Sequence, residues 1–430
     1  MEQTSTPPHT PWQARVPFFY GWVIVAVAFG VTFIATAPFW TIGVFIQPMQ
    51  QDLGWSRSAI LGAVTVRGVV ASLAGPLAGA YLDRPGGARN ATVLSGLLAA
   101  GTVLATYRVE SELEFFLVFG VLGGIGSVIQ NSALYGATVP KWFVRRRGTA
   151  VALVTMGSPV ATMVLPSLFA GVIDADGWRA AWLVMGVLSI LLAVLPGFLL
   201  VSQPEDVGLH PDGAIGRAAV ADAAAARGEM SYTLGQAIRS PVFWILNLAL
   251  ALGSLPVAGL PANLVPLFTD RGIGRELAVL GFSTYGLLGL LGRIFWGYFI
   301  NRRSITGVLI ILGVYGTVVT PLIFLMQGDV AVSYAPIIAF GIGSYVSFNQ
   351  LVWASYFGRK HLGAITGLAR PFASVTSSMG PFLMAWLYDN LGSYDAGVHM
   401  MTAAWLLSTA ALAWASTAGS RRSTPTAPQP

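Results

Sequence analysis

Long apolar runs alternate with short polar connections along almost the whole chain. A helix needs about 20 predominantly apolar residues to cross the hydrocarbon core of a bilayer, and twelve runs reach roughly that length. We expect membrane-spanning helices at residues 18–46, 58–81, 89–107, 115–138, 148–172, 179–201, 241–268, 277–300, 305–326, 331–357, 363–388 and 396–418. The pattern predicts an all-α membrane protein.

One long polar connection separates the first six predicted helices from the last six. The chain therefore divides into two six-helix halves, which we expect to be related by pseudo-symmetry. The predicted parts are a cytoplasmic N-terminal tail at 1–17, an N-terminal half at 18–201, a cytoplasmic linker at 202–240, a C-terminal half at 241–418 and a cytoplasmic C-terminal tail at 419–430.

The composition supports a membrane protein and narrows its chemistry. Of the 430 residues, 55% are hydrophobic and 10% are charged, whereas soluble domains have about 25% charged residues. The chain has no cysteine, which excludes a disulfide framework and a thiolate site, and its four histidines fall in tails, loops or span ends. We therefore expect no metal and no cofactor. The sequence pI of about 9.7 comes from charges that flank apolar segments, so we expect a bilayer and not nucleic acid as the partner.

The basic residues predict the orientation. With the N-terminus in the cytoplasm, sixteen of the 24 lysines and arginines fall in inner segments, five in outer loops and three within spans. Positive charge is enriched in cytoplasmic connections of membrane proteins. We therefore expect a multi-pass protein with both termini in the cytoplasm.

Short motifs recur at equivalent positions in the two halves. The second span ends with GAYLDR at Gly79–Arg84, and the eighth ends with GYFINRR at Gly297–Arg303. A basic segment precedes the fifth span, from Lys141, and a similar one precedes the eleventh, from Tyr356. Parallel halves with a binding site between them are a known transporter design.

These segments resemble the major facilitator superfamily and, within it, the monocarboxylate transporter and oxalate:formate antiporter branch. The matching segments are Tyr20–Trp22, Asp52–Ser58, Gly79–Arg89, Trp142–Leu153, Gly292–Gly297, Gly380–Pro381 and Tyr388–Tyr394. The resemblance implies secondary active transport of small organic anions, such as lactate, formate or oxalate, by alternating access. It implies a monomer in the inner (plasma) membrane. It also implies that the loop with Asp83 and Arg84 stabilises the closure of the inner side.

Three arginines, Arg67, Arg293 and Arg370, lie inside predicted spans. An arginine at the centre of a membrane helix costs about 2.5–3.5 kcal/mol, so it persists only where it faces protein, water or an anion. The resemblance assigns Arg293 and Arg370 to binding of the substrate carboxylate. Alternatively, Arg293 snorkels to the headgroups and Arg370 packs against loop carbonyls. Arg67 lies nearer the outer side, where it either binds substrate or belongs to the outer gate.

Neutral polar side chains at comparable depth would complete such a site. An anion held by guanidinium groups needs further donors and aromatic walls that exclude water. The candidates in the fourth and tenth spans are Gln130, Asn131, Tyr135, Tyr345 and Asn349. The same residues could instead hydrogen-bond neighbouring helices. Asn263 in the seventh span stands where related bacterial carriers often have histidine, and we assign it to gating.

The acidic residues predict the transport mode. All 18 fall in tails, loops or span ends, whereas proton-coupled carriers commonly use a carboxylate inside the membrane. The animal monocarboxylate carriers have an aspartate four residues before the eighth-span arginine, where this chain has Gly289. Without an internal counter-charge, we expect anion exchange. Proton-coupled symport, and transport of a drug, a sugar or a siderophore, remain alternatives.

No enzyme motif is present in the sequence. There is no HExxH pair for zinc, no P-loop GK[ST] sequence, and no acid or histidine inside a span that could serve as a general base. We therefore expect a carrier without catalytic residues.

Overall fold

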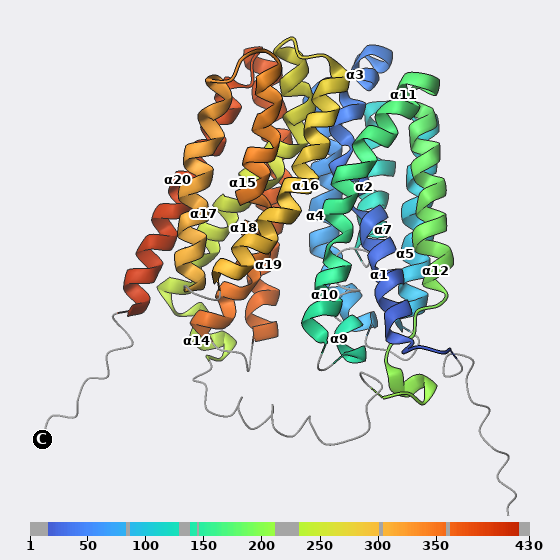
Figure 1. The fold of residues 1–430 in the computed structure, drawn as a ribbon, viewed down its shortest axis with the longest axis vertical. Helices are drawn as coiled ribbons and strands as arrows, with labels where there is room; N and C mark the ends of the chain where they lie inside the picture. The colour runs from blue at the N-terminus through green and yellow to red at the C-terminus, as the bar shows by residue number, and fades with distance from the viewer. Residues whose placement is uncertain are drawn as a thin grey trace, which may run out of the picture.

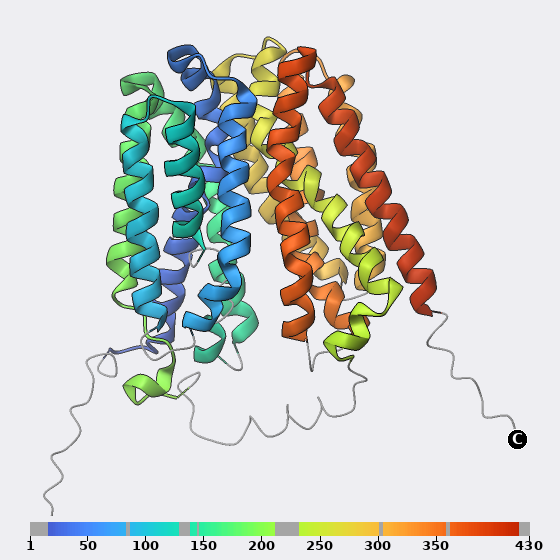
Figure 2. The same cartoon turned by 180° about the vertical axis from the view of Figure 1, so that it is seen from behind.

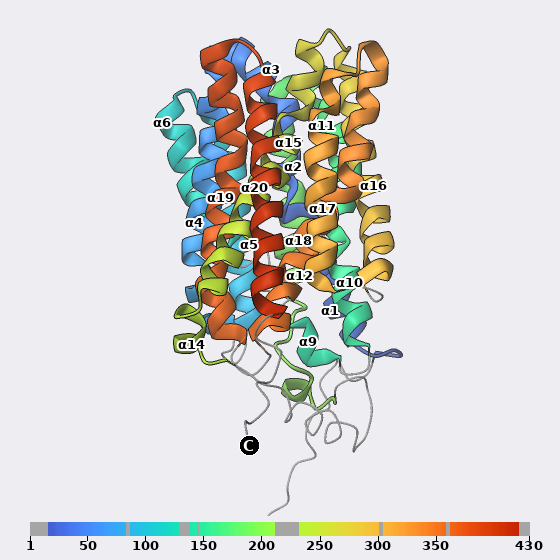
Figure 3. The same cartoon turned by 90° about the vertical axis from the view of Figure 1, so that its left-hand side faces the viewer.

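The structure is a computed structural model, and it describes residues 16–82, 87–128, 138–143, 146–210, 232–300, 304–357 and 362–420. These residues form helices and their connections, and none of them lies in a strand. Helices of the N-terminal half and helices of the C-terminal half form two neighbouring bundles (Figure 1). The two outer helices of the C-terminal half, α20 and α17, lie on the side away from the N-terminal half (Figure 3).

The elements follow the predicted spans in order. The N-terminal half contains α1 (Gly21–Ala35), α2 (Ala37–Trp40), α3 (Ile42–Leu53), α4 (Arg57–Leu82), α5 (Gly87–Ala105), η2 (Thr106–Arg108), α6 (Glu112–Phe115), the π-helix η3 (Phe116–Leu122), α7 (Gly123–Ser127), α9 (Val139–Trp142), α10 (Arg147–Thr155), α11 (Gly157–Ser189), the π-helix η5 (Ile190–Val194) and α12 (Leu195–Gly197). The connection to the second half contains η6 (Pro204–Val207) and α14 (Leu234–Ile238). The C-terminal half contains α15 (Pro241–Asp270), α16 (Arg275–Ile300), α17 (Ile305–Val319), η9 (Thr320–Phe324), η10 (Gly328–Ser333), α18 (Tyr334–Phe357), α19 (Leu362–Leu391) and α20 (Asp395–Ser420).

Eight helical segments in the described part of the chain are long and apolar enough to cross a membrane. One of them, Thr149–Gly197, has 49 residues, which is about 74 Å of helix and more than twice the thickness of the hydrocarbon core. Gly177, with φ 84°, interrupts α11 in the middle of this segment. The segment therefore holds two crossings. Helices α18, with 24 residues, and α19, with 30 residues, also have spanning length but are not among the eight.

Several predicted features lie outside the described residues. The fourth span, expected at 115–138, is described up to Val128, and residues 129–137 are not. The proposed inner-closure residues Asp83 and Arg84 and residues 1–15 and 421–430 of the tails also lie outside the described ranges.

Helix α1 begins and α20 ends at the same end of the bundle, the lower end in Figure 1. We call this the terminal end and the opposite end the distal end. Both halves have an even number of predicted spans, and an even number of crossings returns each half to the end where it began.

The halves meet where α4 packs on α19, where α11 packs on α16, and where α3 packs on α15. Across the first pair, Thr65 Oγ1 donates to the Ser378 carbonyl at 2.6 Å. A β-carbon on Gly68 would lie 2.0 Å from Ser378 Oγ, and one on Gly286 would lie 2.5 Å from the backbone of α11. Small residues therefore let the helix backbones approach closely where the halves touch.

These contacts lie toward the distal end. The hydrogen bonds of Ser58, Thr65 and Ser167, the ring contact of Tyr285 and the ion pairs of Arg57 and Arg275 across the halves all lie at or distal to the level of Thr65 and Tyr285. From this level the two halves diverge toward the terminal end in Figures 1 and 2. The distal side is closed in this conformation.

Within the C-terminal half, α16 and α18 pack with very little space between their backbones. A β-carbon on Gly292 would lie 2.1 Å from the Phe340 carbonyl oxygen, and one on Gly343 would lie 3.3 Å from Gly289. Trp296 Nε1 also donates to the Phe340 carbonyl at 3.1 Å. This packing holds the middle of α16, including Arg293, against α18.

We expect Gly292→Ala to destabilise the C-terminal half. The added methyl group meets backbone that cannot rotate away, and overpacking of this kind costs about 1–3 kcal/mol. The thermal unfolding midpoint of the detergent-solubilised protein should fall by several degrees. Gly297→Ala is the matched control, because a β-carbon there meets nothing within 4 Å. Equal midpoints for the two variants would contradict this packing.

Candidate functional site

Arg293 lies on the face of α16 that points toward the N-terminal half. Seven residues earlier on the same helix, Gly286 touches α11 of that half, and seven residues is about 20° short of two full turns. Arg293 is therefore about 10 Å further toward the terminal end, just beyond the last contact between the halves. Its side chain is half-buried, and Nε donates to the Gly343 carbonyl of α18 at 3.0 Å.

Arg370 lies at a similar depth on α19. Ser378, which touches Thr65 and Gly68 of the N-terminal half, lies eight residues or about 12 Å away along the helix toward the distal end. Helices α16 and α19 run in opposite directions, so both arginines fall on the terminal side of the contacts. The side chain of Arg370 is exposed.

The described acidic residues all lie at helix ends or in connections. Asp174, Asp270 and Asp389, which take part in contacts between the halves, are at the distal end. The middle of the described membrane-spanning segments thus carries positive charge from arginine and no carboxylate. An anion that enters from the terminal side would meet this charge at Arg293 and Arg370.

Arg67 is held inside the N-terminal half. It is 8% exposed, and Nη1 donates to the Phe119 carbonyl at 3.3 Å. The guanidinium carbon lies 5.0 Å from the centre of the Phe119 ring. A β-carbon on Gly123 would lie 2.3 Å from Nη1, so glycine at this position leaves the space that the guanidinium occupies.

Two of the neutral candidates, Tyr345 and Asn349, lie on α18 in the described part of the chain. Tyr345 is fully buried between α15 and α20, where its hydroxyl lies 3.1 Å from Ser408 Oγ and its ring packs on Trp405. It is two residues from Gly343, about 200° around α18, and so faces away from the Arg293 contact. In this conformation it packs the C-terminal half and does not line the site. Asn349 is half-buried on the same helix.

The other three neutral candidates fall in the fourth span, outside the described residues. They are Gln130, Asn131 and Tyr135.

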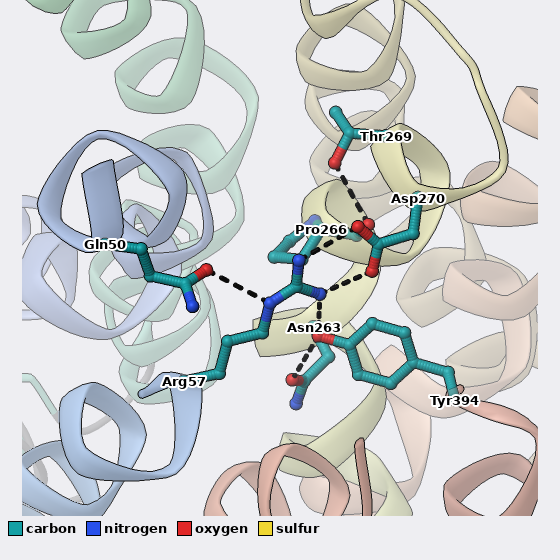
Figure 4. A network of polar contacts seen from close by, with 7 residues as sticks. All are labelled: Gln50, Arg57, Asn263, Pro266, Thr269, Asp270 and Tyr394. Carbon is teal, nitrogen blue, oxygen red and sulfur yellow. Dashed lines mark hydrogen bonds and ion pairs between the residues drawn. The ribbon is translucent and has the colours of Figure 1, made fainter. Parts of the chain in front are cut away.

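A polar network closes the distal end between the halves (Figure 4). Arg57, the first residue of α4, binds Asp270 at the end of α15 through both terminal nitrogens, at 2.5 and 2.9 Å. Its Nε donates to Gln50 at 3.1 Å, and Nη1 donates to the Tyr394 hydroxyl at 3.1 Å. Tyr394 in turn donates to Asn263 Oδ1 at 3.2 Å. Paired charged hydrogen bonds of this kind are among the strongest polar contacts in proteins.

A second arginine makes the related contact from the other half. Arg275, the first residue of α16, pairs with Asp174 of α11 and donates to the Val44 carbonyl of α3 at 3.3 Å. Arg57 likewise reaches α15 and lies 4.0 Å from the ring of Tyr388 on α19. Each half therefore uses the first residue of its second crossing to hold the first and fifth crossings of the other half. We call these two arginines with their partners the distal latches.

The distal latches were not predicted from the sequence, which shows Arg57 and Arg275 only as loop charges. Two of the segments that carry the family resemblance, Asp52–Ser58 and Tyr388–Tyr394, contribute to one latch. Asn263, assigned to gating from the sequence, belongs to the same network, where Nδ2 donates to the Gly259 carbonyl at 2.9 Å.

Comparisons with known proteins agree with this architecture. The family model described as Major Facilitator Superfamily matches residues 28–381. Monocarboxylate transporter 12-B of Danio rerio is 26% identical over 403 residues, which cover 88% of this chain and 83% of that protein. Monocarboxylate transporter 11 of Homo sapiens is 25% identical over 407 residues, which cover 92% and 81%.

A solved structure supports the fold. The crystal structure of a bacterial homologue of the human lysosomal transporter Spinster, in an inward-facing and unoccupied conformation, superposes with a TM-score of 0.72. It covers 94% of this chain and 98% of its own at 14% identity, which supports the fold and nothing finer. The predicted fold class is thus confirmed. Because the family model spans most of both halves, the chain belongs to the Major Facilitator Superfamily, a family of multi-pass membrane carriers rather than enzymes.

Proposed function

We propose that this carrier transports small organic anions, mono- or dicarboxylates such as lactate, formate or oxalate, by alternating access. The observation that carries the proposal is the position of Arg293, on the face of α16 toward the other half and just beyond the last contact. Arg370 lies at a similar depth on α19. Relatives named as monocarboxylate transporters support the same class of substrate.

The chemistry of the site follows from the guanidinium group. Its planar pair of N–H donors matches a carboxylate and binds it through two parallel hydrogen bonds. Arg293 and Arg370 both belong to the C-terminal half, so an anion bound to them would be covered when the N-terminal half closes over the terminal side. Asn349, and Gln130, Asn131 and Tyr135 of the fourth span, are the proposed neutral donors.

The positive-inside pattern supports a cytoplasmic position for the terminal end. The closed distal side then corresponds to an inward-facing carrier. To face outward, the halves would rock about the central site, which breaks the distal latches and brings the terminal ends of the halves together. The loop with Asp83 and Arg84 is the proposed contact for that second closure.

Exchange follows from the distribution of charge. No carboxylate lies in the middle of a described crossing. A carrier that changes between the inward-facing and outward-facing states without a bound anion would therefore bury two guanidinium charges in a state closed on both sides. Removing a charge from water without an opposite charge is costly. A bound anion lowers that cost, and the carrier would therefore change between the two states mainly when an anion is bound.

We expect Arg293→Ala to reduce counterflow of labelled lactate, formate or oxalate in proteoliposomes by about 10-fold to 100-fold. Hydrogen bonds to a charged group contribute about 1.5–3 kcal/mol each. Arg293→Lys keeps the charge without the paired donors and should lose less. Arg108→Ala, which removes an exposed arginine from a connection, is the control. Uptake at the wild-type rate by correctly folded Arg293→Ala protein would refute the role.

Anion exchange makes a prediction about efflux. Proteoliposomes loaded with labelled anion should release it at least several-fold faster when unlabelled anion is present outside, because the empty carrier turns slowly. Imposing a pH gradient should change the rate little. Efflux into anion-free buffer that is as fast as exchange would exclude an obligatory exchanger, and acceleration by the pH gradient would favour proton-coupled symport.

Arg57→Ala should open the distal side. Loss of the paired bond to Asp270 should shift the equilibrium toward the outward-facing state by roughly 10-fold or more. Since the chain has no cysteine, a single Ser378→Cys reporter at the contact between the halves can be labelled with a membrane-impermeant maleimide from the distal side. Labelling should be faster in Arg57→Ala.

Arg179→Ala is the matched control for the latch, because Arg179 pairs with Asp52 at the same end but within one half. Labelling at equal rates in the two variants would show that the latch does not hold the distal side closed.

A further inference from the structure

Arg67 is the one arginine within a described span to which the proposed function assigns no role. It is next to Gly68, which packs against Ser378 at the terminal edge of the contacts between the halves. Ser378 and Arg370 are eight residues apart on α19, so Arg67 lies about 12 Å distal to the level of Arg370. It is thus at the boundary between the closed distal side and the proposed anion site.

The hydrogen-bonding capacity of Arg67 is mostly unused. A guanidinium group has five N–H donors, and the described residues supply one acceptor, the Phe119 carbonyl, at 3.3 Å. No carboxylate among the described residues pairs with it. Among the described residues, its one other contact with compensating charge is the face of the Phe119 ring. A buried cation in such surroundings costs free energy. A state of the protein in which Arg67 meets an opposite charge would recover part of that cost.

The surroundings of Arg67 indicate which state that is. The side chain is 8% exposed and faces η3 and α7, whereas Leu73, at 65%, marks the exposed side of the same helix. Arg67 therefore points into the protein and not toward lipid. Opening of the distal side separates α4 from α19 and breaks the contact of Gly68 with Ser378. The neighbouring Arg67 would then be reached from the distal side.

We propose that Arg67 is a second carboxylate-binding residue that acts only when the distal side is open. When the distal side is closed, its guanidinium group packs against Phe119. In the open state its unused donors bind the carboxylate of an external anion, which then passes to Arg293 and Arg370. The inference rests on the proposed function. Arg67 and Arg370 are separated by about 12 Å along the helices. One formate or lactate therefore binds first at Arg67 and then at Arg293 and Arg370, and not at both places together.

The test compares affinities on the two faces of the membrane. In proteoliposomes of defined orientation, Arg67→Gln should raise the KM for external lactate, formate or oxalate by about 10-fold or more. The KM for internal anion, and the rate at saturating external anion, should stay within about twofold. The thermal midpoint should not fall, because a buried charge with one acceptor has been removed. Arg179→Gln, at the distal end but within one half, should change neither KM.

A second variant keeps the test independent of how glutamine packs. In the cysteine-free chain, Arg67→Cys should show the same loss of external affinity. Treatment from the distal side with 2-aminoethyl methanethiosulfonate, which leaves an ammonium group on the cysteine, should restore at least part of it. Methyl methanethiosulfonate, which leaves a neutral group, should not.

The outcomes separate this inference from the proposed function. Equal changes in KM on both faces, no change on either face, or equal effects of the two reagents would overturn the role of Arg67. If Arg293→Ala abolishes exchange in the same preparation, carboxylate transport through Arg293 stands whatever Arg67 does. If Arg293→Ala exchanges normally, the proposed function fails first.

Discussion

The cost of holding a positive charge inside a membrane is the constraint on which the rest of this structure depends. Arg293 and Arg67 meet it in different ways. Arg293 uses a backbone carbonyl of α18 that becomes accessible because glycines let two helices approach closely. Arg67 uses a carbonyl and an aromatic face within its own half. Both of these contacts are with neutral groups. In the proposed function, the opposite charge comes from a mobile anion.

The arginines at the distal end are stabilised in a different way. There arginine and aspartate form direct pairs across the halves, and they lie at helix ends where water can reach them. Exposed ion pairs contribute little individually, but Arg57 is largely buried and makes a paired contact with additional neutral donors and acceptors. In the proposed transport cycle, the two latches hold the distal side closed and break when it opens.

The features that could be predicted from the sequence are those whose cause lies within one segment of the chain. Contacts between residues far apart in the sequence could not be predicted. The spans followed from apolar runs, because each helix must satisfy its own backbone within the bilayer. The position of Arg293 inside a span followed from the same apolar runs. The latches could not be found in this way, since their partners are 213 and 101 residues apart and nothing local marks them. Tyr345 was assigned to the site because a polar residue inside a helix bundle has the same local pattern whether it faces a substrate or, as here, Ser408.

The two kinds of packing in the molecule explain how halves can move without losing their structure. Inside each half, large side chains interlock: Phe115, Phe119 and Trp182 form one continuous aromatic cluster. Between the halves, Trp40 packs on Tyr285, and other contacts along the spans come from small and polar groups, such as the hydroxyls of Ser167 and Ser283, 2.9 Å apart. Interlocked aromatic side chains resist separation because opening them creates cavities. Small residues with single hydrogen bonds part and rejoin at low cost, and water can replace each bond. This packing favours movement in which each half stays rigid and the two halves separate along the surface between them.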